Sequence, residues 1–561
     1  MDRPSHTPVA VVGGGPVGLL LALFLDHHGV ESVVFDTADA VQAEPRGSTH
    51  GARTMEHYRR LGLAPRVRAL GLPGGHSAGI SFFTRYAGHL LADLPWPGPD
   101  AVRAHVAAAD RTDQVPEPMH RANQMYVERL LWEHAGTRPR ITLRYGHRVT
   151  ALAEHPDRVE VTADGPDGPR TWHADFVAGC DGGHSLVRRS LGIAYTGEGT
   201  LDQDVLGRRA TAAHLRVPGL RAEFLRERAG WSNWVFNEEL ALNLIALDGA
   251  DEFFLLTSSA DPDGAADEDL AALVRRAAGV PLDVEVLSRR AWTPGAALVA
   301  ERFGAGRTWL AGDAAHLFTP NGGFGMNTGV DDAANLAWKL AAAVQGWAGP
   351  GLLPSYEAER RPVALRNTTA ARELNIGLGA IERPAALEAD TAEGRAARQK
   401  TGARLAEYGL LTLDTIGVQL GARYDASPVV DAGGDAPPPD AFTTYTPSGV
   451  PGGRAPHLWL EEGDGRLEEG DGAGGRASLF DRFGAGFTLL SLCAIHPDTS
   501  GFEEAARERG VPLSVLRVHD PAARELYGRD LVLVRPDQHV AWRGNRPPKD
   551  PGAVLALVTG Y

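Results

Sequence analysis

Two glycine-rich elements far apart in the chain carry residues of the types that bind phosphate and hydroxyl groups. The first, Gly13-x-Gly15-x-x-Gly18, follows the apolar run Val9–Val12 and precedes the helix-like segment Pro16–His28. Glycines let the backbone approach a diphosphate, and a helix N-terminus offers free N–H groups to it. An acid after the next strand can accept hydrogen bonds from ribose hydroxyls. The pattern predicts dinucleotide binding by Gly13, Gly15, Pro16, Val17, Gly18 and Asp36.

The second element begins at Gly312-Asp313 and continues through Pro320 to the segment Gly322–Asn327. Asp313 follows a predicted strand, Thr308–Ala311, so its carboxylate would lie at a sheet edge where it could bind the hydroxyls of a ribityl chain. The glycines permit an irregular turn into a helix, whose first N–H groups could stabilise a reduced flavin. A loop that merely caps a helix is the alternative. We expect the flavin to contact Gly312, Asp313, Pro320, Gly323, Gly325, Met326 and Asn327.

The elements that must position these residues form an α/β domain. Strand Val9–Val12, helix Pro16–His28 and strand Val33–Phe35 make a βαβ unit. Strand Thr308–Ala311 returns to this domain after a long excursion. Further elements expected here are helices Met55–Leu63, Tyr126–His134, Gly325–Val344 and Glu357–Leu378, and strands Val149–Ala153, Val159–Ala163 and Phe176–Ala178.

The excursion and the C-terminal end differ in pattern from this domain. Between Leu201 and Arg289 the chain shows strand-like runs such as Phe253–Thr257, which indicate an inserted sheet-rich domain. Tyr424–Gly453 is rich in Pro, Gly and Asp and is predicted to be a linker. We assign 1–75, 100–200 and 290–378 to a discontinuous nucleotide-binding domain, 76–99 and 201–289 to a substrate-binding sheet domain, 379–450 to a helix and linker, and 451–561 to a C-terminal domain.

Composition limits the classes of function. A chain of 561 residues with 43% hydrophobic residues is expected to form two or three globular domains. The net charge of −15 argues against a nucleic-acid partner. The two cysteines, Cys180 and Cys493, form no CxxC pair, which favours a reducing, cytoplasmic location. No segment reaches the roughly 20 apolar residues of a membrane span, and no spacing predicts a metal site. The acidic repeat EEGDG within Glu461–Gly472 is predicted to be an exposed loop rather than a calcium site.

Taken together, the motifs resemble the p-hydroxybenzoate hydroxylase type of single-component FAD-dependent aromatic hydroxylase. Besides the two glycine elements, the matching residues are Arg46, Arg53-Thr54-Met55-Glu56, Gln124, Cys180-Asp181-Gly182-Gly183-His184-Ser185, Arg188 and Tyr356–Pro362. The resemblance implies that Arg46, Gln124 and Val149 contact FAD. It also implies that Asp181 and Gly182 lie close to both FAD and a transiently bound NADPH or NADH.

The C-terminal end, with Arg454–His457 and Arg535-Pro536-Asp537, resembles the thioredoxin-like domain of the larger phenol and polyketide hydroxylases. Because the CxxC pair is absent, we expect a structural or dimer-related role, and a homodimer is one expectation. The fold class is therefore α/β: a Rossmann-like FAD-binding domain with an inserted sheet-rich substrate domain and a thioredoxin-like C-terminal domain.

Three positions depart from the family pattern. Asp36 replaces the more common Glu, Thr319 replaces the first residue of a Pro-Pro pair, and Phe324 stands where Gln is common. Phe324 either lies beside the flavin and packs on the substrate or fills a gap in the core. Candidate pocket residues are Trp231, Trp234, Phe236, Trp292 and Phe324, each of which has a core role as its alternative. No acid or base is assigned; His50, His316 and Pro320 are the candidates.

The resemblance implies hydroxylation of a phenolic or polycyclic aromatic, polyketide-type substrate through a flavin C4a-hydroperoxide, with NADPH or NADH and O2 as co-substrates. Baeyer–Villiger oxygenation or ring rearrangement of a polyketide quinone, and a non-catalytic flavin- or quinone-binding protein, stay open as alternatives. A flavin halogenase is not favoured, because its Trp-x-Trp-x-Ile-Pro signature is absent.

Overall fold

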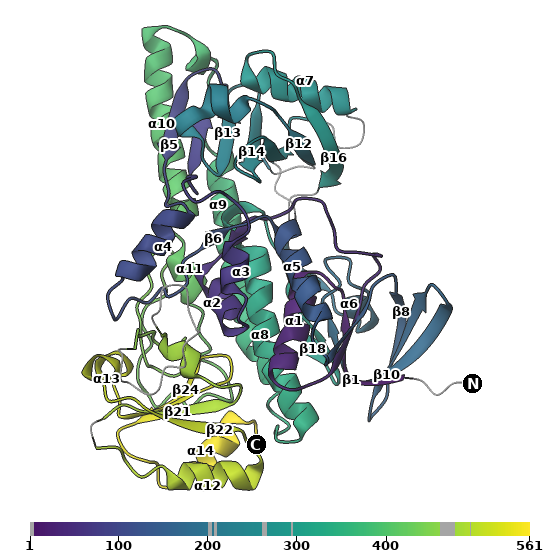
Figure 1. Cartoon of the computed structure of the whole chain (residues 1–561), viewed down its shortest axis with the longest axis vertical. Coiled ribbons are helices and arrows are strands. Elements are labelled where there is room, and N and C mark those ends of the chain that lie inside the picture. The colour runs from purple at the N-terminus through teal and green to yellow at the C-terminus, as the bar shows by residue number, and fades with distance from the viewer. Residues whose placement is uncertain are drawn as a thin grey trace.

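Three parts follow one another along the long axis of the chain, which is described by a computed structural model (Figure 1). The α/β domain that contains the two glycine elements lies in the middle, between a sheet domain at one end and the C-terminal domain at the other. The structure describes residues 5–199, 203, 205–206, 210–260, 266–292, 296–460, 477–493 and 495–561. The EEGDG repeat lies outside these residues.

The central domain is built on a sheet with the strand order β18-β19-β10-β1-β2-β7. Strands β1, β2, β7, β10 and β19 run parallel to one another, so their C-terminal ends meet at one edge. The residues between Leu19 and Leu25 make α1 almost wholly apolar, which suits a helix packed between this sheet and α8. The bounds are β1 Ser5–Val12, β2 Ser32–Phe35, β7 Ile141–Arg144, β10 Gly168–Gly179, β18 Gly304–Ala305, β19 Thr308–Leu310 and α1 Pro16–His27.

Further elements complete this domain. Strand β10 is far longer than the predicted Phe176–Ala178, because its first half alternates polar and apolar residues and pairs with β9 in an antiparallel meander. Helix α2 ends before the predicted Leu63, since Gly62 has a φ of +70° and breaks the helix. The bounds are β3 Thr49–His50, β6 His120–Arg121, β8 Arg148–Glu154, β9 Val159–Gly165, β11 Tyr195–Glu198, β17 Ala297–Ala300, β20 His316–Leu317, α2 Ala52–Arg60, α3 Ala64–Arg68, α4 Pro99–Ala108, α5 Gln124–Gly136 and α6 Leu186–Ser190.

The sheet domain has seven strands in the order β16-β12-β15-β14-β13-β4-β5. Its side chains alternate between two buried faces: Phe82 and Trp234 lie on one, while Phe83 and Val235 lie on the other. Helix α7 packs on the second face, and α10 packs along β5. The bounds are β4 Ile80–Phe83, β5 Leu90–Leu94, β12 Ala210–Arg216, β13 Ser232–Phe236, β14 Ala241–Ala246, β15 Glu252–Thr257, β16 Glu285–Trp292 and α7 Asp267–Ala278.

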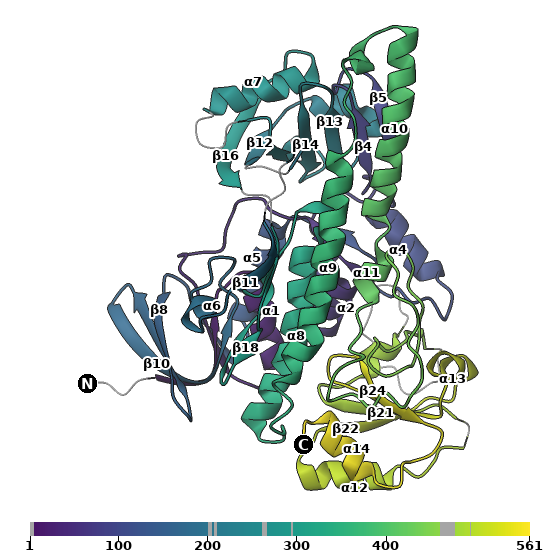
Figure 2. The ribbon, with the colours of Figure 1, turned by 180° about the vertical axis from the view of Figure 1, so that it is seen from behind.

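Three long helices link the parts of the molecule. Figure 2 shows α9 rising from the central domain to the sheet domain, with α10 beside its upper end. Helix α10 occupies a large part of the region expected to be a helix and linker. The bounds are α8 Phe324–Gln345, α9 Ser355–Gly379, α10 Ala392–Leu413 and α11 Ile416–Leu420.

The C-terminal domain has a four-stranded sheet in the order β22-β21-β23-β24. A parallel β21-α12-β22 unit is followed by the antiparallel pair β23–β24 and a final helix, which is the thioredoxin-like arrangement. Phe487 of this sheet packs against Trp338 and Trp347 at the end of α8. The bounds are β21 Phe487–Ser491, β22 Leu513–Arg517, β23 Leu531–Val534, β24 Val540–Gly544, α12 Ser500–Arg509, α13 Pro521–Tyr527 and α14 Pro551–Val558.

In the part of the chain that the structure describes, no helix combines the length and the apolar composition that a bilayer crossing requires.

Candidate functional site

The first glycine turn lies between the C-terminal ends of β1 and β10. Gly13 has a φ of +107°, and a Cβ atom there would come within 2.3 Å of the Cys180 carbonyl oxygen. Gly18 packs as closely, because its Cβ would lie 1.9 Å from the Gly13 oxygen. At Gly15, by contrast, no atom other than those of its immediate chain neighbours lies within 4 Å of a built Cβ, and α1 begins there without a side-chain cap. The turn therefore has open space and uncapped N–H groups on one side, which suits a diphosphate.

Asp36 lies beside this turn at the end of β2. Its Oδ2 accepts a hydrogen bond from the Gly14 N–H at 2.6 Å, and its Oδ1 accepts one from Ala38 at 2.8 Å. Each carboxylate oxygen keeps a lone pair that a ribose hydroxyl could use. Tyr145, which the sequence did not indicate, donates its hydroxyl to the Gly14 carbonyl at 2.6 Å. Asp36 and Tyr145 thus fix the turn from two directions.

Arg46 and Gln124 meet at the start of α5, although 77 residues separate Arg46 from Asn123. Asn123 accepts a hydrogen bond from the Arg46 N–H and donates one to the Arg46 carbonyl at 2.8 Å. It also caps α5 by accepting from Met125 N–H. Gln124 donates to Glu128, whose pKa is raised by burial. The Arg46 side chain is exposed and lies close enough to Asp313 to affect its pKa.

The Asp181-Gly182 element forms the next side of the site. Asp181 Oδ2 accepts hydrogen bonds from the first N–H groups of α6, at 2.7 and 3.1 Å. Asp181 Oδ1 is buried and has no hydrogen-bond partner among the described residues, and burial raises the pKa of this carboxyl group. Gly182 has a φ of +79° and faces open space. An unpartnered buried acceptor next to an open glycine is the environment that a cofactor hydroxyl or amide could complete.

Asp313 lies opposite Asp181, after β19. Tyr195 donates its hydroxyl to the Asp313 carbonyl at 2.5 Å and stacks on Arg188, so it joins the two elements. Asp313 is exposed as a residue. The protein around it raises its pKa through desolvation, while His316 and Arg46 oppose this shift. Val149 differs from these residues, because its side chain lies in the core and only its backbone could meet a cofactor.

The loop before α8 is fixed against β3. Gly322 and Gly323 have φ values of +79° and +66°, which favour glycine. Asn327 donates to the carbonyls of Thr49 and Gly323, at 3.0 and 2.6 Å, and accepts from Gly51 N–H at 2.8 Å. The helix begins at Phe324, one residue before the predicted start at Gly325. Pro320 precedes the short turn at Asn321–Gly323, and Gly325 packs on the Phe318 ring.

The glycine elements therefore offer open space, and an acceptor without a partner among the described residues, that suit FAD. Gly15, Gly182 and the exposed Asp313 face open space, and Asp181 has an acceptor without a partner in the described chain. The order from the α1 N-terminus to the α8 N-terminus matches a ligand with a diphosphate, a polyhydroxyl chain and a ring. Within the described residues, no group of three or more His, Cys, Asp or Glu side chains could hold a metal ion.

Phe324 lies where the central domain meets the sheet domain. It is 4% exposed and its ring packs edge-on against Phe442 at 6.2 Å. It belongs to the same apolar cluster as Phe82 and Trp234, whose rings stack at 6.3 Å, and as the fully buried Phe236. Phe324 also lines a pocket with Thr49, Asn327 and Gln419. Trp231 is half-buried, and the side chain of Trp292 lies outside the described residues.

The two histidine candidates are held by protein groups. His50 is fully buried, its nitrogens lie 3.1 Å from the Tyr58 hydroxyl and the Ala122 carbonyl oxygen, and burial lowers its pKa to about 3. His316 Nε2 lies 2.5 Å from Asp332, which also accepts hydrogen bonds from Arg360 and the Gly312 N–H. His50 therefore connects β3 to α2, and His316 is connected through Asp332 to the Gly312 turn. Neither ring is exposed to solvent.

A buried ionic network, which the sequence motifs did not reveal as a unit, joins the central and C-terminal domains. Arg535 binds both oxygens of Glu359 at 2.6 and 2.7 Å, and Lys339 binds the same carboxylate at 2.6 Å. Glu56 of α2 similarly accepts from Arg53 and Arg454. Arg535 lies 176 positions from Glu359, and Arg454 lies 398 positions from Glu56, so no local pattern could predict these two contacts.

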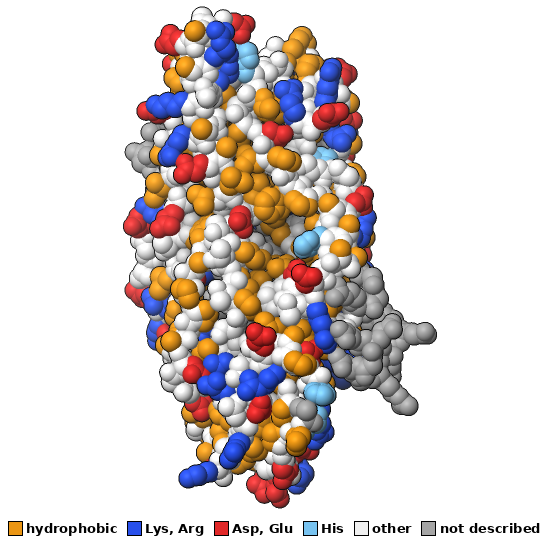
Figure 3. All heavy atoms as spheres, turned by 90° about the vertical axis from the view of Figure 1, so that its left-hand side faces the viewer, with side chains coloured by type: hydrophobic (Ala, Val, Ile, Leu, Met, Phe, Trp, Pro, Cys, Tyr) orange, Lys and Arg blue, Asp and Glu red, His pale blue; other side chains and the backbone are white. Residues whose placement is uncertain are grey.

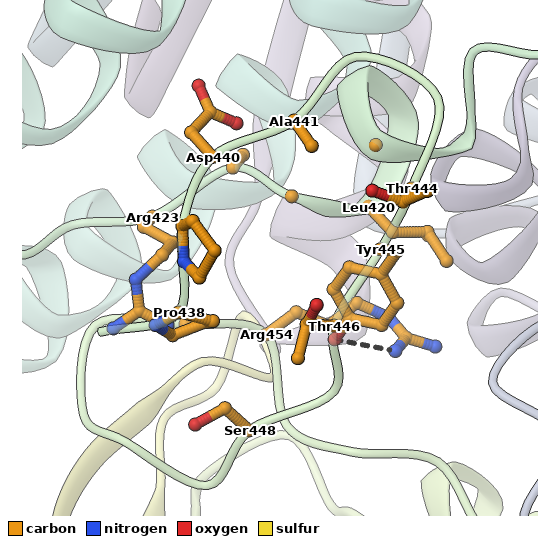
Figure 4. Close-up of a pocket in the computed structure, with 15 residues that line it drawn as sticks. Leu420, Arg423, Pro438, Asp440, Ala441, Thr444, Tyr445, Thr446, Ser448 and Arg454 are labelled. Carbon is orange, nitrogen blue, oxygen red and sulfur yellow. Dashed lines mark hydrogen bonds between the residues drawn. The ribbon is translucent and has the colours of Figure 1, made fainter. Parts of the chain in front are cut away.

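A second hollow lies away from the glycine elements, in the segment after α11 (Figure 4). Arg423, Tyr445 and Arg454 line it, and Tyr445 lies 3.3 Å from Arg454 Nη1. Arg423 already binds Asp425, and Arg454 binds Glu56. We therefore do not assign a ligand to this hollow.

Comparison with protein-family models gives two matches. Residues 6–371 match the FAD binding domain, and residues 448–560 match the aromatic-ring hydroxylase C-terminal domain.

Relatives and a solved structure match along nearly the whole chain. The FAD-dependent monooxygenase apdD of Emericella nidulans is 32% identical over 595 residues, which span 100% of this chain and 92% of that protein. Aklavinone 12-hydroxylase RdmE of Streptomyces purpurascens is 31% identical over 579 residues, which span 98% of this chain and 97% of that protein. The structure of the rebeccamycin biosynthetic enzyme RebC with reduced flavin is 35% identical, has a TM-score of 0.87 and covers 100% of both chains.

Proposed function

The chain belongs to the family of FAD-dependent aromatic-ring hydroxylases and is a flavoprotein monooxygenase; we propose that it hydroxylates a phenolic, polycyclic aromatic substrate of the polyketide type. NADPH or NADH is the reductant. Bound FAD supplies the chemistry that activates O2 and transfers one of its oxygen atoms. The protein binds and orients the substrate and excludes water.

The proposed FAD contacts run from the N-terminus of α1 to the N-terminus of α8. The N–H groups of Gly15 and of the first residues of α1 after Pro16 would hold the diphosphate, and Asp36 would bind a ribose. Asp313 would accept from the ribityl hydroxyls, while Arg46 and Gln124 would close the outer side. The Gly323–Asn327 turn would support the ring. Asp181 Oδ1 is the one buried acceptor of the set that has no partner in the described chain.

One observation carries the proposal for a large aromatic substrate: the loop expected to hold the flavin ring and the apolar face of the sheet domain share a single cluster. Phe324 directly follows this loop as the first residue of α8, whereas Phe82 and Trp234 belong to the sheet, and all three pack in that cluster. Aromatic faces of this kind stabilise a flat ligand by stacking. The relative from Streptomyces purpurascens is an aklavinone hydroxylase, which supports a substrate of this class.

The alternatives drawn from the sequence are not favoured. The relatives are monooxygenases and hydroxylases, which disfavours a non-catalytic binding protein. No residue of the described site gives separate support for Baeyer–Villiger oxygenation or ring rearrangement.

The proposal is tested with purified holoenzyme and a panel of anthraquinones, naphthoquinones and simple phenols. We expect one or more polycyclic phenols to stimulate NADPH or NADH oxidation with matched O2 uptake and to gain one oxygen atom at a ring carbon. NMR of the product separates ring hydroxylation from ring expansion. A turnover confined to simple phenols would contradict the proposed substrate class.

The homodimer and the cytoplasmic location stay predictions. Leu410 and Leu411 of α10 are 54% and 43% exposed. Figure 3 views the molecule from the left-hand side of Figure 1 and shows hydrophobic side chains gathered along the middle of that face. Light scattering of the holoenzyme tests the homodimer, since a mass near that of one 59.7 kDa chain would contradict it.

A further inference from the structure

Arg121 differs from the four other arginines that are buried among the described residues. Each of those four binds a carboxylate: Arg53 and Arg454 bind Glu56, Arg360 binds Asp332, and Arg535 binds Glu359. Arg121 is 6% exposed, and no acidic side chain of the described residues forms an ion pair with it. Burial lowers its pKa to about 9.

The neighbours of Arg121 fix its position without neutralising it. Its Nη1 donates to the Thr49 hydroxyl, across the β3–β6 pair. Its guanidinium carbon lies 3.6 Å from the centre of the Trp231 ring, which is a close cation–π contact. Its Nε has no hydrogen-bond partner in the described chain, and neither has the buried Nε1 of Trp231. Two N–H donors, one of them cationic, are therefore held together with nothing to accept their hydrogen atoms.

This pair lies at the boundary of the proposed substrate site. Thr49 touches the flavin-ring loop, because a Cβ on Gly323 would come within 2.8 Å of the Thr49 side chain. On the other side, Trp231 immediately precedes β13, whose Trp234 and Phe236 face the apolar cluster. Arg121 thus reaches from the central domain to the sheet domain at the point where ring and substrate should meet.

A buried guanidinium without a counter-charge carries a large desolvation cost, which an anion can offset. We propose that Arg121 and Trp231 bind an anionic oxygen of the aromatic substrate, carried by an ionised phenol, an enolate or a carboxylate. The proposal rests on the proposed function and adds the charge of its substrate. The anionic groups of FAD are the other source of such an oxygen, and the experiment distinguishes the two.

The test measures dissociation constants of oxidised holoenzyme for two probes of nearly equal size, anthraquinone-2-carboxylate and anthraquinone-2-carboxamide, from the change in flavin absorbance. The wild type should bind the carboxylate at least tenfold more tightly, which corresponds to about 1.4 kcal/mol. In Arg121→Met this ratio should fall to about one, whereas Arg121→Lys should keep most of it. Trp231→Phe, which retains the ring but lacks the N–H, should lower the ratio by a smaller factor.

Arg228→Met is the matched control. Its guanidinium lies 5.4 Å from the Phe83 ring on the opposite face of the same sheet, so it removes one positive charge without touching the proposed site. It should keep the wild-type ratio. A ratio near one in the wild type overturns the proposal, even if Arg121→Met fails to fold. An unchanged ratio in a folded Arg121→Met variant, together with weaker FAD binding, would assign the arginine to the cofactor and also overturns it.

The inference and the proposed function fail in different ways. If no aromatic compound of either charge stimulates NADPH or NADH oxidation, the proposed function fails. If only neutral aromatic compounds bind and stimulate turnover, the function stands and the anionic site is refuted.

Discussion

Replacing Arg535 with Met should destabilise the protein strongly, because it breaks the ionic network that docks the C-terminal domain. Arg535 makes a forked contact with Glu359 at 2.6 and 2.7 Å and also binds Asp537 at 2.7 Å, and both Arg535 and Glu359 are inaccessible to solvent. Removing Arg535 leaves Glu359 with Lys339 as its remaining cation and takes the arginine partner from Asp537, and breaking a buried ion pair in this way costs about 3–5 kcal/mol. Arg535→Lys keeps the charge but not the fork, so its loss should be smaller.

Thermal unfolding followed by circular dichroism and by the release of flavin fluorescence measures this effect. The midpoint for Arg535→Met should fall well below that of the wild type. Lys400→Met is the control, because Lys400 and Glu382 form an ion pair in which both side chains are 74% exposed. It should leave the midpoint unchanged. Equal midpoints for Arg535→Met and Lys400→Met would refute the assigned role of the network.

The pH dependence follows from the same contacts. Burial alone would raise the pKa of Glu359, but Arg535 and Lys339 hold it at about 2, below its ordinary value of 4.5. A depressed carboxyl pKa gives stability that is complete above the unfolded value and is lost as the pH falls through the folded value. The wild-type midpoint should therefore drop between about pH 4.5 and pH 2. Arg535→Met should show a weaker dependence in this range.

Three further substitutions test the site. Asp313→Ala should weaken FAD binding by about 1.5–3 kcal/mol through loss of a charged acceptor, and full flavin occupancy after dilution would contradict this role. Phe324→Gln should change substrate affinity or the position of hydroxylation while leaving FAD content intact; unfolding with an unchanged product pattern would mark Phe324 as a core residue. Replacing both Cys180 and Cys493 with Ser should leave flavin turnover largely intact. If this replacement abolished a thiol-dependent electron transfer, the cysteines would have a redox role.

Local sequence patterns predicted those parts of the fold that depend on neighbouring residues. The βαβ unit is specified by an apolar strand, a glycine turn and Pro16 at the first turn of a helix, and the structure places α1 at Pro16–His27. The strands of the sheet domain were likewise visible as short runs, such as Phe253–Thr257. Helix ends shifted where glycine geometry intervened, as at Gly62.

The parts that the sequence could not reveal depend on contacts between distant residues. Tyr145 reaches the glycine turn across 131 positions, and Arg53 reaches Gln538 across 485. Strand β4 pairs with β13 in parallel, so Phe82 meets Trp234 only after folding. The isolation of Arg121 is a property of the packed interior, since nothing in His120-Arg121 distinguishes it from a paired arginine. Such features need the three-dimensional structure.

Isotope labelling tests the central claim most directly. Holoenzyme supplied with NADPH or NADH and a polycyclic phenol that it turns over, under ¹⁸O2, should release a product that carries one ¹⁸O atom on a ring carbon, found by mass spectrometry and NMR. Incorporation of oxygen from water, or cofactor oxidation that yields hydrogen peroxide and unchanged phenol, would contradict the account.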